Sequence, residues 1–144
     1  MFRFTSLLNK GYVEDLERLM FFNPGQIAMQ DAIMDSVEKF GMPSIVDIDG
    51  YLRINVGKFN DVQTIFALEE ERLVGILVYY RFSTETLTVI HIAVEEDYSS
   101  KGRYSHNMLM MRMLELLRTN ARRVSGINSI RILYGPNNTL DYRV

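Results

Sequence analysis

The chain has 144 residues, of which 47% are hydrophobic and 24% are charged, and its formal net charge is −2. These values are typical of one globular domain with its own hydrophobic core. A general nucleic-acid-binding protein would carry a basic excess, so this class is disfavoured. The sequence contains no cysteine, which excludes disulfides, thiolate nucleophiles and cysteine-based metal sites. The two histidines, His91 and His106, lack metal-ligand spacing, so no metal site is predicted.

The ends and the apolar runs of the chain give no sign of targeting. The first ten residues are too short and too polar for a signal peptide. No apolar run approaches the roughly 20 residues needed to span a bilayer. We therefore expect a cytoplasmic protein with no membrane partner, folded as a single domain over residues 1–144.

A helical period marks the first third of the chain. Apolar residues recur three or four positions apart at Val13, Leu16, Leu19 and Met20. The segment 23–25 then breaks the pattern, and a second helix is predicted over residues 26–40. Gly41 is the expected C-cap of this helix, and Pro43 prevents its continuation.

The pattern then changes to the alternation of β-strands. Strands are predicted over residues 51–56, 62–68, 73–82, 87–94 and 129–134. The connections through residues 69–72 and 83–85 are short and force antiparallel neighbours, because a parallel crossover needs about a dozen residues. The last strand follows a helix and can be parallel to its predecessor. The predicted fold is an α+β domain with a mixed, mostly antiparallel sheet flanked by helices.

The turn after residue 94 is the most informative segment. Residues 95–102 form a polar turn with one glycine, and a long amphipathic helix is predicted from about Arg103 to Arg123. The first turn of a helix has unpaired N–H groups that attract anions, and Lys101 adds positive charge. The segment therefore suits a phosphate or pyrophosphate, or else forms an ordinary turn that begins a helix.

This order of elements resembles the GCN5-related N-acetyltransferase (GNAT) superfamily, most closely over residues 73–117. In that family the strand is followed by a segment that often contains Pro-x-x-Arg/Gln-x-x-Gly-x-Gly/Ala. Gly102 matches the first glycine, whereas Ser99 replaces the Arg or Gln and Tyr104 replaces the second small residue. The resemblance thus implies a degenerate acyl-CoA loop and a fold without the family's usual C-terminal helix and strands.

The resemblance implies acetyl-CoA as the cofactor and a primary amine, on a small molecule or a protein, as the acceptor. Ala93 and Val94 would offer backbone groups to the pantetheine arm. The pyrophosphate would be bound by the loop residues Ser99, Ser100, Lys101, Gly102, Arg103, Tyr104 and Ser105.

The resemblance also suggests catalytic residues. His91 is the first candidate for the base, because it lies on the strand expected to border the acetyl group and imidazole titrates near neutrality. Glu95 and Glu96 are alternatives that would act through water. Tyr142 is the nearest match to the family's proton-donating tyrosine, although it comes earlier than the family's spacing. Asn137 or Asn138 resembles the asparagine that usually precedes that tyrosine.

Two further patterns leave alternatives open. Tyr79 and Tyr80 point to opposite faces of their strand, so one belongs to the core and the other lines a groove for the acceptor. The helix predicted over residues 103–123 has too many apolar residues for one narrow stripe along its surface. They predict burial on a broad face of this helix, or a homodimer interface.

The preferred function is acetyl transfer from acetyl-CoA to a primary amine. The alternative is a non-catalytic protein of the same fold, a pseudoenzyme that binds or regulates protein partners, which Ser99 and Tyr104 favour. A third alternative is an unrelated α+β ligand-binding domain, which a sheet without a splay beside Val94 would favour.

Overall fold

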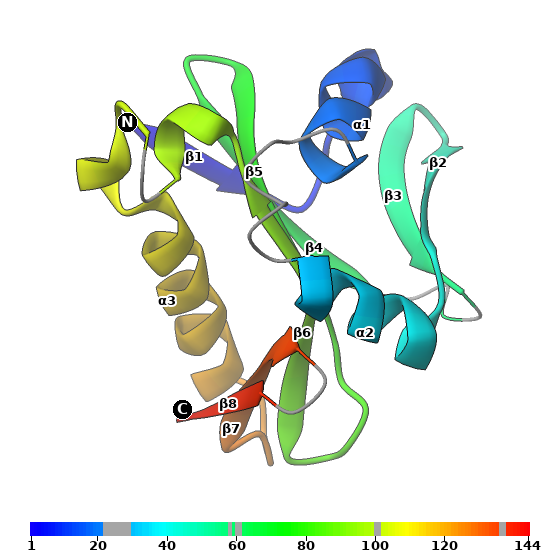
Figure 1. The fold of residues 1–144 in the computed structure, drawn as a ribbon, viewed down its shortest axis with the longest axis vertical. Coiled ribbons are helices and arrows are strands. Elements are labelled where there is room, and N and C mark those ends of the chain that lie inside the picture. Colours follow the sequence, from blue (N-terminus) through cyan, green and yellow to red (C-terminus); the bar gives the residue numbers. More distant parts are fainter. Residues whose placement is uncertain (22–29, 58, 60–61, 100–101, 136–137) are drawn as a thin grey trace.

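The computed structural model describes residues 1–21, 30–57, 59, 62–99, 102–135 and 138–144 (Figure 1). Its α-helices are α1 (Val13–Phe21), α2 (Gln30–Phe40) and α3 (Leu109–Arg122). Its strands are β1 (Phe2–Thr5), β2 (Pro43–Ile48), β3 (Tyr51–Val56), β4 (Gln63–Glu69), β5 (Arg72–Tyr80), β6 (Thr86–Val94), β7 (Ser129–Gly135) and β8 (Asn138–Arg143). Short 3₁₀-helices are η1 (Lys10–Tyr12), η3 (Glu96–Tyr98) and η4 (Ser105–Asn107).

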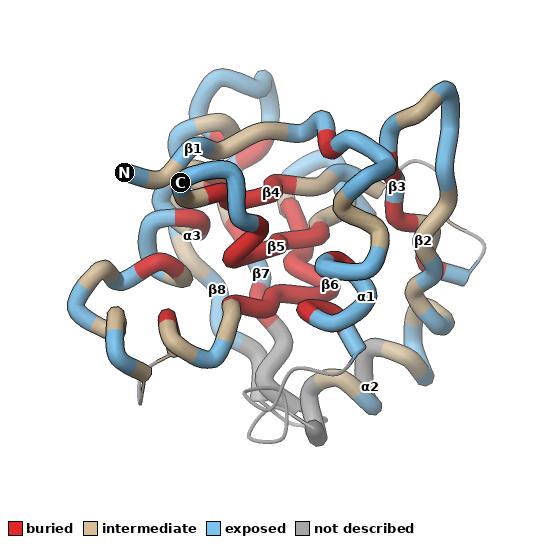
Figure 2. The backbone as a smooth tube through the Cα atoms, turned by 90° about the horizontal axis from the view of Figure 1, so that it is seen from above, coloured by how far each residue is buried: buried red, intermediate tan, exposed pale blue. Residues whose placement is uncertain are grey.

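A six-stranded sheet in the order β1-β4-β5-β6-β7-β8 forms the centre of the fold, and β2 and β3 form a separate hairpin. All neighbours in the large sheet are antiparallel except β6 and β7, which are parallel. Helix α3 packs on one face, and α1 packs on the other (Figure 1). The buried residues concentrate on the central strands (Figure 2). The α+β fold with a mostly antiparallel sheet is therefore confirmed.

The strand prediction was incomplete. It missed β1, β2 and β8, which are short or contain polar and turn-forming residues and are stabilised by tertiary contacts. Strand β3 was predicted from its alternation, and the structure pairs it with β2, because alternation identifies a strand without identifying its partner.

The end of α2 agrees with the sequence. Gly41 has a φ of +101° and its N–H donates to the carbonyl of Val37 at 2.9 Å, as expected for a C-cap glycine. A Cβ on Gly41 would lie 2.6 Å from Cα of Gly57. Because neither Gly41 nor Gly57 has a side chain, the end of β3 can lie directly against the C-terminus of α2. The predicted start of this helix at residue 26 lies outside the described residues.

Helix α3 is shorter than predicted, but it packs on a broad face, because the partly buried Met110, Leu114 and Leu116 also contact the core. It begins at Leu109, not near Arg103, because η4 and Met108 with a φ of +51° precede it. Its fully buried residues lie four positions apart at Leu109, Met113, Leu117 and Ala121. At Gly75 in β5, a Cβ would lie 3.1 Å from Cε of Met113. The absence of a side chain there brings the first turns of α3 close to the sheet.

Candidate functional site

A β-bulge in β6 sets the faces on which its central side chains lie. Val78 of β5 pairs with His91, but the next residue, Tyr79, pairs with Val89, so Ile90 is the extra residue. Directly paired residues share a face of the sheet, and Val78 belongs to the core on the α1 side. The bulge therefore places two consecutive side chains, those of Ile90 and His91, on the face that α1 covers.

The parallel pair β6–β7 covers only the first part of β6. The pairing runs from Thr86 opposite Ser129 to Val89 opposite Ile132, whereas β6 continues to Val94. The end of β6 therefore separates from the β7 ladder within the described residues. Ala93 and Val94 lie in this part, both buried and paired with β5. The bulged residue, Ile90, directly follows Val89, which is the last residue of β6 that pairs with β7.

His91 is buried, with 8% of its surface exposed. Burial lowers the pKa of His91 to about 4 because the charged imidazolium loses its hydration. The ring is therefore neutral at pH 7. A neutral imidazole has a nitrogen that can accept a proton, but the lowered pKa makes it a weaker base than an exposed histidine.

Tyr142 lies on the other face of the sheet. It pairs with Ile130 of β7 and packs against the core on the α3 side. His91 faces the α1 side, so the structure does not bring these two candidate catalytic residues together. Asn137 lies outside the described residues, and Asn138 begins β8.

The two candidate glutamates at the end of β6 have different surroundings. Glu95 forms an ion pair with Arg72, with 2.7 Å between Oε1 and Nη2, and its N–H donates to the carbonyl of Val74. Glu96 is exposed and begins η3. Glu95 therefore ties the loop to β5, while the Glu96 carboxylate is accessible to solvent.

The loop after β6 uses many of its own amide groups. Gly102 donates to the Ser99 carbonyl at 2.9 Å, Tyr104 to Asp97 at 2.6 Å, and Ser105 to Gly102 at 3.3 Å. The hydroxyl of Ser99 donates to the Glu96 carbonyl at 2.7 Å. These N–H groups point into the loop and not toward a ligand. Ser100 and Lys101 lie outside the described residues.

The close approach at Gly102 is to the protein itself. A Cβ at this position would fall far inside van der Waals contact with the carbonyls of Glu96 and Asp97. Its φ is not in the left-handed region, so the requirement for glycine is steric. The sequence singled out this glycine for a cofactor, which stays a prediction, and the structure adds that the loop itself requires a residue without a side chain here.

Tyr104, which replaces a small residue of the family pattern, belongs to an aromatic cluster. Its ring centroid lies 5.3 Å from that of Tyr98, which lies 5.7 Å from that of Phe2. The Tyr98 hydroxyl donates to Oε2 of Glu69. Burial, together with this bond, raises the pKa of Tyr98, and the bond lowers the pKa of Glu69. The cluster therefore fixes the loop against β1 and β4.

The start of α3 is the part of this region that suits an anion. Among the described residues, no acceptor is recorded for the first amides of the helix, those of Leu109, Met110 and Met111. Two arginines lie nearby: Arg103, 5.7 Å above the Tyr104 ring, and Arg112, 5.4 Å above the Phe2 ring. Unpaired amides and two guanidinium groups fit a phosphate.

Two pockets lie near the other end of α3, and the sequence analysis did not predict their position. One, of about 240 Å³, is lined by residues that include Tyr79, Arg81 and Val124. The second, of about 700 Å³, is lined by parts of β1, β3 and β4 with Leu116 and Asn120 of α3. Both Tyr79 and Tyr80 line the first pocket, and Tyr80 also packs against Phe82. Of the two tyrosines, Tyr79 alone lines the larger pocket.

Two other features concern the described part of the chain alone. No group of three or more His, Asp or Glu residues there is arranged to hold a metal ion. Every helix there is too short or too polar to cross a bilayer.

Comparisons with known proteins complete the description of this region. No family model matches the chain, and no curated protein matches it. An IAA acetyltransferase from Bacillus cereus ATCC 14579 is similar in structure, with 15% identity and a TM-score of 0.44 over 92% of this chain. A protein from Bacillus anthracis str. Ames, assigned as a streptothricin acetyltransferase and solved in complex with acetyl coenzyme A, has 10% identity and a TM-score of 0.37 over 92% of this chain. The chain spans 65% of the length of the first protein and 74% of the second.

Proposed function

We propose that the chain is an acyl-CoA-dependent N-acetyltransferase that transfers an acetyl group to a primary amine. The observation that supports this most directly is the separation of β6 from β7 after Val89, followed by a loop and the amide-bearing start of α3. A separated strand end can present backbone groups to an extended ligand. The helix start beside it can bind the ligand's phosphates.

The phosphate contacts in this proposal come chiefly from the first turn of α3. Arg103 and Arg112 add charge to the amides of that turn. Gly102, Tyr104 and Ser105 shape the loop, because their own N–H groups are used within it. Ala93 and Val94 would border the pantetheine arm at the end of β6. When bound, acetyl-CoA supplies a thioester carbonyl that an amine can attack.

His91 is the base of this proposal and acts in its neutral form. Its pKa of about 4 keeps the imidazole neutral at pH 7, with one nitrogen able to accept a proton, but limits the proton affinity of that nitrogen. Glu96 is the alternative, since its exposed carboxylate can act through water. Tyr142 is not included, because it packs on the opposite face of the sheet.

A specific observation favours the non-catalytic alternative as a second candidate. The loop amides that would bind a pyrophosphate are bonded within the loop, and Tyr104 fills the space of a small residue with an aromatic ring. A protein that retains the fold but not the reaction would bind CoA weakly, or not at all, and would release no thiol.

Calorimetric titration with acetyl-CoA and with CoA tests the donor site. We expect micromolar binding that becomes at least tenfold weaker in Arg103→Glu, because charge reversal repels the phosphates. Arg122→Glu is the matched control, since Arg122 is exposed in the last turn of α3 and should leave binding unchanged. Gly102 is unsuitable for this test, because any side chain there disrupts the loop. No heat at millimolar ligand contradicts the proposal.

Release of free CoA thiol in the presence of primary amines tests the reaction. The chain has no cysteine, so a thiol reagent measures product alone without a protein background. Amine-dependent thiol release supports the transferase. CoA binding without thiol release across small amines and lysine-containing peptides supports the non-catalytic alternative.

A further inference from the structure

The outer edge of β4 is only partly covered. In the six-stranded sheet, β4 lies between β5 and β1, but β1 pairs only with Phe66–Glu69. Residues Gln63 to Ile65 pair with β5 on one side. On the other side they have no strand partner among the described residues. This short stretch of strand edge is open to pairing.

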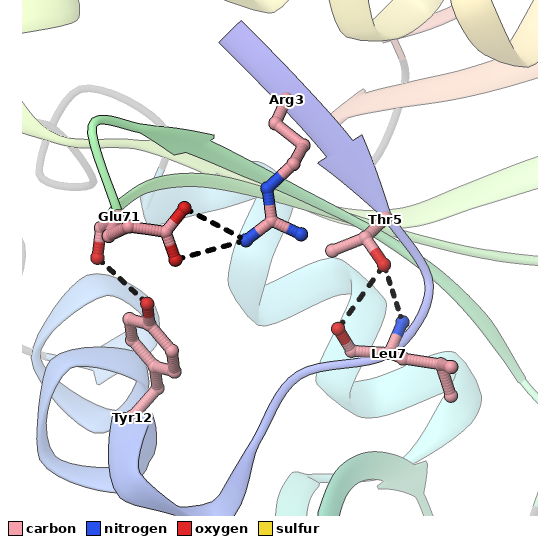
Figure 3. A network of polar contacts seen from close by, with 5 residues as sticks. All are labelled: Arg3, Thr5, Leu7, Tyr12 and Glu71. Carbon is pink, nitrogen blue, oxygen red and sulfur yellow. Dashed lines mark hydrogen bonds and ion pairs between the residues drawn. The ribbon is translucent and has the colours of Figure 1, made fainter.

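The reason that β1 stops lies in its own sequence. The hydroxyl of Thr5 accepts a bond from the Leu7 N–H at 3.1 Å and donates to the Leu7 carbonyl at 3.2 Å (Figure 3). This local turn satisfies the groups with which the chain would otherwise continue along β4. The next residues pair instead with β3, where Leu52 donates to the Leu8 carbonyl at 2.8 Å. The chain therefore leaves β4 at Thr5 and crosses to the hairpin.

A groove of about 700 Å³ lies between these elements. Its walls come from the Thr5–Leu7 turn, from residues 51–54 of β3, and from residues 62–65 at the start of β4. Tyr79 of β5 and Leu116 and Asn120 of α3 complete it. Its volume lies within the range of about 300–1,000 Å³ that is typical of ligand sites. The groove thus contains the uncovered edge of β4.

The lining offers both backbone and side-chain partners to an extended chain. Successive residues of a strand direct their N–H and C=O groups to alternate sides, so at least one of residues 63–65 presents both groups to the groove. Exposed Leu7 and Tyr51 provide apolar contacts at the rim, with 56% and 44% of their surfaces accessible. Gln63 and Asn120 add polar side chains.

The described residues that line the groove carry a positive charge. Arg53 is the one charged residue among them, and its guanidinium has no ion pair with a described residue. None of these described lining residues is an Asp or a Glu. A negatively charged group is therefore the complementary partner. From Phe66 onward the edge of β4 is occupied by β1, so a bound strand must end before Phe66, and a chain terminus meets this condition.

We propose that this groove binds an extended peptide with a free C-terminal carboxylate, which adds as a strand to residues 63–65 of β4 while Arg53 pairs with the carboxylate. Main-chain hydrogen bonds supply the affinity in this mode of recognition, and the pockets along the strand supply selectivity. The site is separate from the proposed donor site. Leu109 and Asn120 are about 16 Å apart along α3, at 1.5 Å per residue.

Amide chemical shifts of the ¹⁵N-labelled protein test the proposal. The probe is the peptide N-acetyl-Thr-Val-Thr-Val with a free carboxylate, together with an equimolar mixture in which its last residue is varied. We expect shifts at Arg53 and at residues 63–65. Affinity should fall at least tenfold when the carboxylate is amidated. Two further peptides carry N-methyl groups on one or the other set of alternate amides. The peptide that is methylated on the amides facing β4 should not bind, because it has lost the hydrogen bonds of the ladder.

Variants at Arg53 separate the effect of its charge on peptide binding from any effect on folding. Arg53→Gln should weaken binding at least tenfold and Arg53→Lys should largely restore it, while the spectrum of each free variant stays dispersed. Arg18→Gln on α1 is the matched control, since that arginine is 68% exposed and outside the groove. The proposal is overturned if neither probe shifts these amides at millimolar concentration, or if the amidated peptide binds equally well. Binding that tolerates every N-methylation also overturns it and indicates a small carboxylate as the ligand.

Discussion

The two ends of α3 face different environments. At its start, the loop from Glu95 to Met108 bonds its amides internally, inserts Tyr98 and Tyr104 into an aromatic cluster and leaves no space at Gly102. Near its end, Leu116 and Asn120 border a groove with an uncovered strand edge. The described loop residues use their polar groups to hold the fold, whereas the groove leaves such groups available. Substitutions at the loop residues Tyr98 and Gly102 should therefore change stability, and substitutions in the groove should change binding.

The largest change in the free energy of unfolding is expected from the titration of His91, which lies close to the loop end of β6. Its pKa is about 4 in the folded chain and 6.5 when unperturbed, so the unfolded chain binds more protons between these values. The free energy of unfolding should therefore fall as the pH decreases from 6.5 to 4, by about 3 kcal/mol. Urea unfolding at several pH values measures this loss. His91→Gln should remove most of this dependence, and an unchanged pH profile in that variant would refute the assignment.

The next effect is expected at Gly102. In Gly102→Ala the methyl group meets the carbonyls of Glu96 and Asp97, so the backbone must shift. We expect a loss of about 2–3 kcal/mol in the free energy of unfolding, as for overpacked sites. Gly11→Ala is the control, because its Cβ would meet only the side-chain oxygen of Asn9, at 3.2 Å. Equal stability of the two variants would show that the loop adapts.

A smaller effect is expected when one hydroxyl is removed from the loop end. Tyr98→Phe loses the bond to Glu69 and should destabilise the fold by about 1–2 kcal/mol. This bond lowers the pKa of Glu69 below its ordinary value of 4.5. Its stabilisation is therefore present above pH 4.5 and is lost as the pH falls. The variant should show a weaker acid dependence in thermal unfolding than the original chain.

The smallest effect is expected from the same change at the groove. Tyr79→Phe removes a hydroxyl that has no recorded partner among the described residues. The free energy of unfolding should change by less than about 0.5 kcal/mol. Thermal unfolding beside Tyr98→Phe makes the comparison direct. A loss as large as that of Tyr98→Phe would show that the groove is also part of the structural framework.

Elements whose apolar residues recur with a clear period can be predicted from the sequence. Strands β4, β5 and β6 were predicted within one or two residues, and helix α1 was predicted from the spacing of its apolar residues, because these elements follow the periods of two and of about 3.6. The turn between β4 and β5 was also predicted, although Glu70 and Glu71 have φ values of +50° and +65° without glycine. The parallel placement of β7 beside β6 is confirmed as well, since a helix connects them. These features depend on residues that are close together in the sequence, so the pattern of the sequence is enough to predict them.

Contacts between distant segments, by contrast, set how these elements combine into sites. The bulge at Ile90 turns His91 toward α1, while Tyr142 reaches the α3 side through β8. The pairing of β3 with β2, and the early end of β1, open the groove beside β4. Gly102 is required by carbonyls five and six residues earlier in the chain, which sequence spacing does not reveal. Faces, partners and close approaches depend on contacts between segments distant in sequence, whereas periodicity records only which side of each segment is apolar.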